Sequence, residues 1–337
     1  MPAARTEVTE LVTGLGMLGR FDDPVAAVQA RPPEVVNVAD DVWERLAESV
    51  GAAAHRQHVY AAWANGGAFL RASDGLRGRP PIRVEWKGNQ LAPGDEVVPA
   101  DLRVDHVYLV SCKYLSDILH NVSPARLFTD LLRGGPRSNR GDWYAEVAPD
   151  AYQEVYAAVR AAMPGDLGLP PFVADLTPAH RVTLKAVLPE RQWPVDALPT
   201  AKAWSCEVAR ASAARWRAAL GSKAEQEALL WRLLRIGSAP YFVLGTSSQG
   251  TLRLRIATPW DWRQAYDLKR FDVSGDEAGQ PVVRWEASVR DRATDEVLAV
   301  AGHVEIRWSH GKFGNPPEAK VYLDTPHHRV PGYITVA

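Results

Sequence analysis

The sequence predicts an α/β protein, and three observations lead to this fold class. The chain has 337 residues, 46% of them apolar and 23% charged, which is typical of a globular protein with a full hydrophobic core. In the first half, runs with the helical period alternate with runs of strand period. The C-terminal third is rich in short alternating runs such as "TLRLRIAT" and "VVRWEASVRD". We therefore expect a mixed sheet flanked by helices, followed by a mixed helical and β-rich C-terminal part.

The first elements form a lead-in and two helices. Residues 1–38 are polar and broken by proline, which predicts a short helix and an extended connector. In "DDVWERLAESV", which starts at Asp40, apolar residues fall on one side and two acids favour the first helical turn. A second helical run, "AAHRQHVYAAWANGGAFLRA", ends before the turn cluster "SDGLRGRPP". A helical pair is thus expected before the first strand.

Three strand signals follow. "IRVEWKG" alternates as a strand does, and "DLRVD" and "VYLVSCKY" predict two strands or one bent strand. "LSDILHNVSPARLFTDLLRGG" then predicts a helix that Pro124 interrupts. A loop at about residues 164–174 predicts a boundary between lobes, and Ser222 with Glu225 predicts a capping box. The expected domains are residues 1–38, 39–163 and 175–337.

Composition limits the function classes. A net charge of −1 does not indicate a strongly basic protein, so any nucleic-acid surface must come from local clusters. Twelve tryptophans could stack on bases or serve as core anchors. Two distant cysteines, the lack of a signal-peptide pattern and the lack of an apolar run of about 18 residues predict a cytoplasmic protein with no membrane association.

The stretch "PADLRVDHVYLVSCKY" places ionisable groups in an apolar setting. Ser111 and Lys113 are two residues apart on a strand, so their side chains share a face, while Cys112 faces the other layer. A hairpin with its turn at Asp105 would place Asp101 beside them. Burying an ionised group without a partner is costly, so these groups either are solvated or meet a ligand.

This pattern resembles the PD-(D/E)xK, or restriction-endonuclease-like, nuclease superfamily. "PAD" is similar to the first half of the family's motif, and "SCK" to the second half, with serine in place of the acid. The resemblance covers roughly residues 40–150. It implies a core of helix, three strands, helix and a further strand. It also implies an endonuclease that requires Mg²⁺ or Mn²⁺ and hydrolyses DNA in restriction, phage defence or repair, with possible protein partners and possible oligomers.

The resemblance gives each residue of the motif a role. Asp101 would be the main metal ligand, and the carbonyl oxygen of Cys112 a backbone ligand. Lys113 would orient the attacking water or stabilise the charge that develops on the phosphate. These roles make Asp101 and Lys113 the central catalytic candidates.

Serine at position 111 departs from the family pattern, because a hydroxyl is a weak ligand for Mg²⁺. A carboxylate from elsewhere would then complete the site, with Glu85 as the first candidate and Asp105 as the second. Glu44 or Glu48 corresponds in position to the helix glutamate that such nucleases often contribute. Without such a carboxylate, the chain would be a non-catalytic nucleic-acid-binding or scaffold subunit with a degraded nuclease site.

Other interpretations of the same region remain open. "EWK", Glu85 to Lys87, is a literal acid-x-lysine motif with Asp74 upstream, although further strands follow it where a helix is expected. Cys112 beside Lys113 could be a nucleophilic thiol. Each of these charged residues could also be a solvated or structural group at a sheet edge.

Cations in the C-terminal half are candidates for contacts with substrate. Arg253 and Arg255 share one face of "TLRLRIAT", and Arg307 and Lys312 flank a glycine-rich turn. Together they could contact DNA phosphates or base edges, or they could form the solvated face of an antiparallel sheet.

Overall fold

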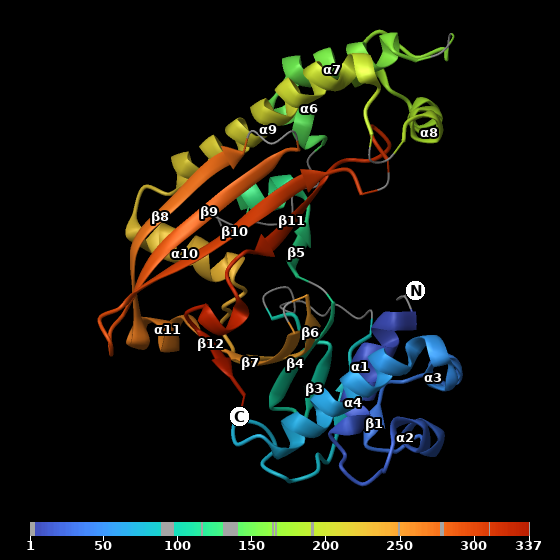
Figure 1. Ribbon diagram of the computed structural model, residues 1–337, viewed down its shortest axis with the longest axis vertical. Coiled ribbons are helices and arrows are strands. Elements are labelled where there is room, and N and C mark those ends of the chain that lie inside the picture. Colours follow the sequence, from blue (N-terminus) through green and yellow to red (C-terminus); the bar gives the residue numbers. More distant parts are fainter. Residues whose placement is uncertain are drawn as a thin grey trace. The chain divides into compact units, whose positions relative to one another are not determined.

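The computed structural model divides the chain into two compact units (Figure 1). It describes residues 4–88, 98–115, 117–130, 141–163, 165, 167–189, 192–248, 250–276, 280–309 and 311–336. Unit 1 comprises Met1–Asp117, Arg235–Tyr266 and Pro326–Ala337, and unit 2 comprises Ile118–Leu234 and Asp267–Thr325. These discontinuous units do not coincide with the division predicted from sequence, and the loop at 164–174 lies inside unit 2.

Both units are mixed α/β, which confirms the predicted class. The sheet of unit 1 has seven strands in the order β1-β2-β3-β4-β6-β7-β12. They are β1 (Val35–Val36), β2 (Val84–Trp86), β3 (Leu102–Val104), β4 (Tyr108–Tyr114), β6 (Tyr241–Ser247), β7 (Gly250–Ile256) and β12 (Tyr333–Thr335). Strands β2, β3 and β4 form an antiparallel meander, whereas β6 runs parallel to β4. The three strands expected around the motif are therefore adjacent.

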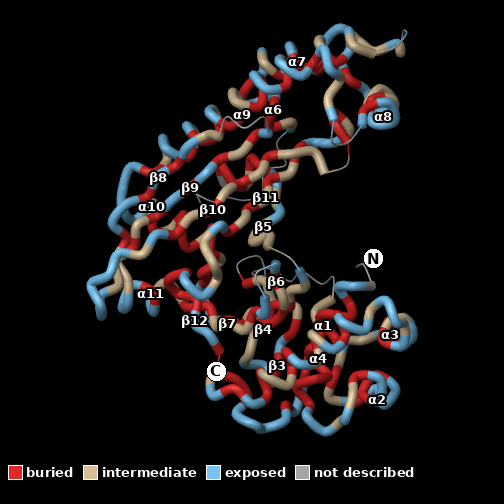
Figure 2. Tube along the Cα trace, in the orientation of Figure 1, coloured by how far each residue is buried: buried red, intermediate tan, exposed pale blue. Residues whose placement is uncertain are grey.

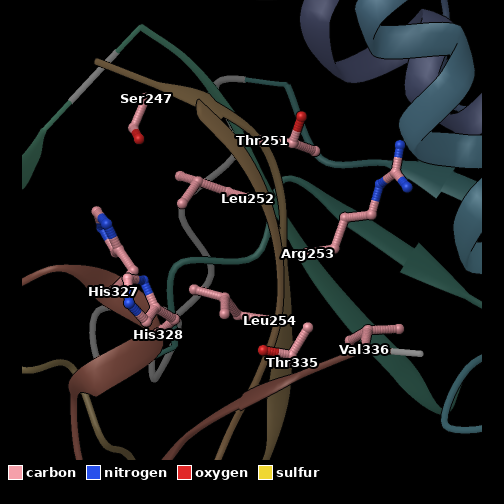
Figure 3. Close-up of a pocket in the computed structure, with 9 residues that line it drawn as sticks. All are labelled: Ser247, Thr251, Leu252, Arg253, Leu254, His327, His328, Thr335 and Val336. Atoms are coloured by element: carbon pink, nitrogen blue, oxygen red, sulfur yellow. The ribbon is translucent and has the colours of Figure 1, made fainter. Parts of the chain in front are cut away.

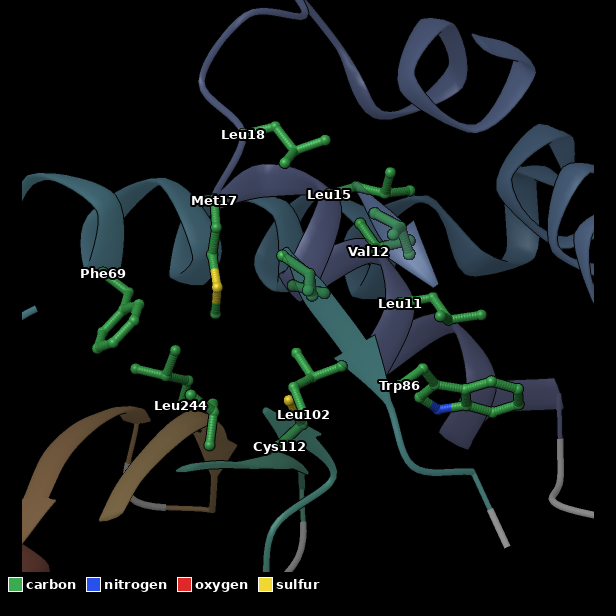
Figure 4. Close-up of a cluster of buried hydrophobic side chains, with 14 of the residues drawn as sticks. Leu11, Val12, Leu15, Met17, Leu18, Phe69, Trp86, Leu102, Cys112 and Leu244 are labelled. Atoms are coloured by element: carbon green, nitrogen blue, oxygen red, sulfur yellow. The ribbon is translucent and has the colours of Figure 1, made fainter. Parts of the chain in front are cut away.

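Helices cover one face of this sheet (Figures 1 and 4). They include α1 (Ala4–Gly16), α2 (Pro24–Ala30), α3 (Asp40–Gly51) and α4 (Arg56–Arg71), while α11 (Pro259–Ala265) follows β7. Leu11, Val12 and Leu15 of α1 pack with Leu102 and Cys112 of the sheet in one apolar core. Side chains of this kind on one helical face explain why α1 folds onto the sheet.

Residues 1–38 contain the predicted short helix as α1, and a second helix, α2, lies where a connector was expected. Almost all of α1 beyond residue 6 is buried, as Figure 2 shows. It crosses α4 so closely that a Cβ on Gly66 would lie 2.0 Å from the carbonyl oxygen of Thr13. Only glycine permits this approach, so the "NGG" of α4 is a packing feature. The helix predicted from Asp40 is α3, and Val42, Leu46 and Val50 are buried as expected.

Unit 2 contains a five-stranded antiparallel sheet in the order β5-β11-β10-β9-β8. Its strands are β5 (Ile118–Val122), β8 (Tyr266–Asp276), β9 (Val282–Asp291), β10 (Val297–Arg307) and β11 (Glu318–Leu323). Its helices include α6 (Trp143–Val147), α7 (Pro149–Ala161), α8 (Pro178–Val187), α9 (Leu198–Ala219) and α10 (Lys223–Leu233). Ser222 and Glu225 form the predicted capping box at the start of α10.

Strand β5 shows that the prediction of a helix over "LSDILHN" was wrong. Its backbone pairs with β11, with His120 opposite Val321 and Val122 opposite Ala319. Strand pairing with a distant segment therefore outweighs the local helical pattern. Among the described residues, no helix combines the length and the apolar character needed to cross a membrane.

Candidate active site

A tight hairpin between β3 and β4 builds the candidate site. Leu102 pairs with Val110, and the turn places Asp105 and His106 at φ 49° and 60°, in the left-handed region. Aspartate tolerates this conformation better than most residues because its side chain bonds nearby backbone. The predicted hairpin and its turn are thus present.

The hairpin brings Asp101, Ser111 and Lys113 together. Oδ2 of Asp101 accepts hydrogen bonds from the backbone N–H of Cys112 at 2.6 Å and from Oγ of Ser111 at 3.3 Å. Burial raises the pKa of Asp101, and the charge of Lys113 opposes this shift. Burial likewise lowers the pKa of Lys113, and Asp101 opposes that shift. Each charge thus favours the ionised form of the other.

Glu10 of α1 adds a second carboxylate to this group. It is 8% exposed, and its Oε2 accepts a hydrogen bond from Nε1 of Trp86 at 2.6 Å. Burial, together with the charge of Asp101, raises the pKa of Glu10 to about 8, while Lys113 opposes the shift. Two carboxylates that disfavour each other's charge beside a lysine form a site that a cation would stabilise.

Sequence reasoning named Glu44 or Glu48 as the helix glutamate and did not consider Glu10. Glu44 and Glu48 are exposed on α3. A usable signal for Glu10 was present, because Val8, Leu11, Val12 and Leu15 follow the spacing of an amphipathic helix. This amphipathic spacing was overlooked because residues 1–38 were interpreted as a lead-in.

Arg235 is a further member of this group that sequence reasoning missed. It precedes β6, and its charge lowers the pKa of both Asp101 and Lys113. It follows Lys113 by more than one hundred residues, and all of Ile118–Leu234 belongs to the other unit. No local pattern could therefore indicate that it lies near the hairpin.

In the structure, the carboxylate of Glu85 pairs with other cationic side chains. Its Oε1 accepts a hydrogen bond from Nη2 of Arg103 at 3.0 Å, and Arg83 and His106 also lie within 3.4 Å. The hydrogen bond from Arg103 lowers the pKa of Glu85, so this carboxylate is ionised and paired. It is not among the groups that shift the pKa of Asp101. Glu10, rather than Glu85, is the carboxylate whose pKa responds to Asp101 and Lys113.

Asp105 stabilises the turn of the hairpin. Its Oδ1 accepts hydrogen bonds from the backbone N–H groups of Ile82 at 2.8 Å and Arg83 at 3.0 Å. It lies at the opposite end of β3 from Asp101.

The alternative motif, Glu85 to Lys87 with Asp74 upstream, has no support from Asp74, because the carboxylate of Asp74 pairs with Arg255 at 3.8 Å.

The four cations predicted to bind substrate divide between the units. Arg253 projects from β7 on the side away from Leu252, His327 and His328, and its Nε donates to Asn65 at 3.1 Å (Figure 3). The pocket in that view has a volume of about 340 Å³. Arg253 and Arg255 belong to unit 1, whereas Arg307 and Lys312 belong to unit 2. They are therefore two separate pairs.

The donor set fits a hard divalent cation such as Mg²⁺. Asp101 and Glu10 offer carboxylate oxygens, and Mg²⁺ often takes one or two carboxylates while keeping several waters. Within the described ranges, no group of three or more His, Cys, Asp or Glu side chains is placed to hold a metal. A metal held by Asp101 and Glu10 would have two carboxylate ligands, a number that is common for Mg²⁺.

Cys112 does not have the surroundings of a nucleophile. It is 8% exposed and belongs to the apolar core shown in Figure 4. Burial, with the nearby charge of Asp101, raises the pKa of its thiol well above the ordinary value. Since the thiolate is the reactive form, the cysteine-enzyme interpretation loses its chemical basis. The suggested role of its carbonyl oxygen stays a prediction.

Comparisons with protein-family models, with curated proteins and with solved structures found no match for this chain.

Proposed function

We propose that the chain is a metal-dependent nuclease that hydrolyses DNA phosphodiester bonds, of the restriction, phage-defence or repair type. One observation carries the proposal: a half-buried lysine, Lys113, interacts electrostatically with both Asp101 and Glu10. One buried and two half-buried ionisable groups held together are costly for folding, and such clusters with shifted pKa values are common at active sites.

The strand arrangement around the cluster supports the same proposal. An N-terminal helix, the antiparallel β2–β3–β4 meander and a fourth strand parallel to β4 agree with part of the order that the resemblance to the PD-(D/E)xK superfamily implies, whereas the segment directly after β4 forms β5 instead of the expected helix. Asp101 immediately precedes the second strand of the meander, and Lys113 lies near the end of the third. The resemblance assigns the aspartate and the lysine to these strands.

Each residue of the site would have a separate role in hydrolysis. Asp101 and Glu10 would hold Mg²⁺ or Mn²⁺, which when bound lowers the pKa of water and neutralises phosphate charge. The backbone N–H of Cys112 and the hydroxyl of Ser111 fix the orientation of the Asp101 carboxylate. Lys113, positioned on β4 and kept charged in part by Asp101, would present its ammonium group to the oxygens of a bound phosphate.

Ser111 favours a second candidate, a nucleic-acid-binding or scaffold subunit with a degraded site. A hydroxyl replaces the usual acid, and it donates to Asp101 rather than offering a charge to a metal. The two candidates differ in one property, since a degraded site should not bind Mn²⁺ through Asp101. Metal titration therefore separates them.

Cleavage of supercoiled plasmid and of single-stranded circular DNA in Mg²⁺ or Mn²⁺ tests the proposal. We expect Asp101→Asn and Lys113→Met each to reduce the cleavage rate by at least about a hundredfold, because each removes a charge used in the transition state. Glu34→Gln is the matched control, since it removes a unit 1 carboxylate that pairs with Arg20 on the surface. Titration calorimetry with Mn²⁺ should show binding that Asp101→Asn abolishes.

Wild-type cleavage by both variants would overturn the site assignment. Metal binding without cleavage of either DNA would reject the nuclease activity on these substrates. The absence of both metal binding and cleavage would leave the scaffold as the better candidate.

A further inference from the structure

Unit 2 contains a cavity that is separate from the cluster at Asp101. Its volume is about 600 Å³, within the range of roughly 300–1,000 Å³ that is usual for small-molecule sites. Trp193, Trp204 and Trp308 form an aromatic wall, and Arg307, Lys312 and Lys320 supply the charged lining. Flat apolar rings and cations therefore meet in one cavity.

The aromatic wall is held rigidly. Trp204 and Trp308 are stacked, with centroids 5.3 Å apart and planes at 14°. Trp193 meets Trp308 edge to face at 6.2 Å, and Tyr144 meets Trp308 in the same way at 4.7 Å. Trp204 is buried, whereas Trp193 and Trp308 are half-buried. A flat ligand would find apolar surface here without reordering flexible side chains.

The charges that line the cavity have one sign. Arg307, Lys312 and Lys320 are among the lining residues, and no carboxylate is among them in the part of the chain that the structure describes. Glu305 pairs with Arg307 at 3.0 Å, and Glu318 pairs with Lys320 at 3.7 Å, both outside the lining. The acids thus partly compensate the cations, while the lining itself is positive.

Lys312 is the most buried of these cations, at 5% exposure. Its Nζ donates to the carbonyl oxygens of Pro189 at 2.5 Å and Gln192 at 3.0 Å, and it lies 5.0 Å from the ring centroid of Trp193. An ammonium group loses strong hydration on burial, so its position beside the indole requires compensation. An anionic ligand in the cavity would add to that compensation.

Two indole N–H groups in the wall also lack acceptors. Nε1 of Trp204 and Nε1 of Trp308 are buried with no hydrogen-bond partner among the described residues. Unsatisfied buried donors are uncommon in native proteins and often mark a missing water or ligand. The wall is therefore less completely satisfied than an ordinary core.

We propose that this cavity binds a nucleotide, with its base against the tryptophans and its phosphate toward the cations. A bare phosphate would leave the aromatic wall unused, and a neutral ring would leave the cations unused. The same chemistry is offered by a free mononucleotide and by an unstacked nucleotide of a single strand, whereas duplex bases are shielded by pairing. The proposal does not depend on cleavage at Asp101, because binding in unit 2 requires no chemistry there.

Fluorescence anisotropy with the full chain tests this, in EDTA so that no metal-dependent cleavage occurs. The probes are a labelled single-stranded deoxythymidine 12-mer, the same strand paired in a duplex, and unlabelled thymidine monophosphate as competitor. We expect Trp193→Leu and Arg307→Gln each to weaken single-strand binding at least about tenfold, in line with the loss of one base stack or one phosphate contact.

Two control variants match these changes. Arg290→Gln removes an arginine of similar exposure, 39% against 41% for Arg307, which also pairs with a local acid of unit 2, Asp295, at 3.2 Å. Trp260→Leu removes a 73% exposed tryptophan. Both controls should bind within about twofold of wild type. Circular dichroism checks folding, and Arg307 is exposed enough that its variant should fold normally.

The outcomes separate the two sources of the ligand. Competition by thymidine monophosphate at millimolar concentration or below indicates a free-nucleotide site, whereas binding of the strand without such competition indicates a strand-bound nucleotide; both support the proposal. Absence of binding to the single-stranded 12-mer overturns it. It is also overturned if Trp193→Leu and Arg307→Gln bind as wild type does, if the controls lose as much affinity as they do, or if the duplex binds equally well.

Discussion

His58 shows how a single buried residue of unit 1 responds to its surroundings. It is 3% exposed on α4, with Nε2 2.6 Å from Oγ1 of Thr9 and its ring stacked on Tyr114 at 3.8 Å. Burial lowers the pKa of His58 to about 4, and the charges of Arg5 and His55 act in the same direction. The folded state therefore holds this imidazole neutral near pH 7.

Stability should fall on acidification because of His58. Its pKa is about 4 in the folded state, against 6.5 for an ordinary histidine of an unfolded chain, so the unfolded state binds more protons between these values. The contribution of His58 to the free energy of unfolding is therefore fully present above pH 6.5. It declines by up to about 3 kcal/mol as the pH falls to 4. Urea unfolding across this window should show a weaker pH dependence for His58→Gln. The exposed His328→Gln serves as the control, and an equal pH dependence in all three proteins would contradict the assignment.

At the scale of residues, the sequence could predict which side chains meet only where they are close together along the chain. Asp101, Ser111 and Lys113 could be placed together because strand alternation and one turn fix their relation. Glu10 and Arg235 reach the same cluster only through packing of α1 and the return of the chain at β6. Spacing alone could not predict those contacts.

At the scale of elements, the parallel pairing of β4 and β6 depends on one glycine. Lys113 pairs with Gly245, and a Cβ at position 245 would lie 1.9 Å from the carbonyl oxygen of Lys113. No real Cβ occupies such a position, so any side chain there would push β6 away from the strand that carries Lys113. The same close contact therefore determines both the position of Lys113 and the spacing between β4 and β6.

Gly245→Ala should therefore destabilise the protein by about 1–3 kcal/mol or more, since the clash is with backbone rather than with a flexible side chain. Denaturant unfolding measures the change. Gly51→Ala is the control, because a Cβ at Gly51 meets nothing within 4 Å. An unchanged free energy of unfolding for Gly245→Ala would show that β4 and β6 can separate without cost. The same variant should also lower any cleavage activity through displacement of Lys113.

Elements were predicted well where amphipathic patterns were long and poorly where they were short. Helix α3 and the capping box of α10 appear as expected. "LSDILHN" is short and ambiguous, and its pairing with β11 makes it β5. Partners so far along the chain give no signal in a single sequence.

For the whole molecule, discontinuity limits what the sequence could predict. Unit 1 closes only when Arg235–Tyr266 and Pro326–Ala337 return to it, and β6, β7 and β12 all come from those segments. A loop rich in proline and glycine gave the best boundary signal, yet it lies within unit 2. Boundaries that are set by long-range strand pairing leave no composition change at the crossing points.

This division makes a final prediction about metal binding. Mn²⁺ that binds folded unit 1 through Asp101 should stabilise that unit by about 2.7 kcal/mol at one hundred times its dissociation constant, which is about a hundredfold in exchange rate for its most protected amides. Hydrogen exchange followed by mass spectrometry should show slower exchange in α1, β3 and β4. Strands β9 and β10 should be unchanged, because unit 2 has its own sheet and core. Asp101→Asn should remove the effect. Equal protection in both units, or protection that survives Asp101→Asn, would mean that the metal binds elsewhere.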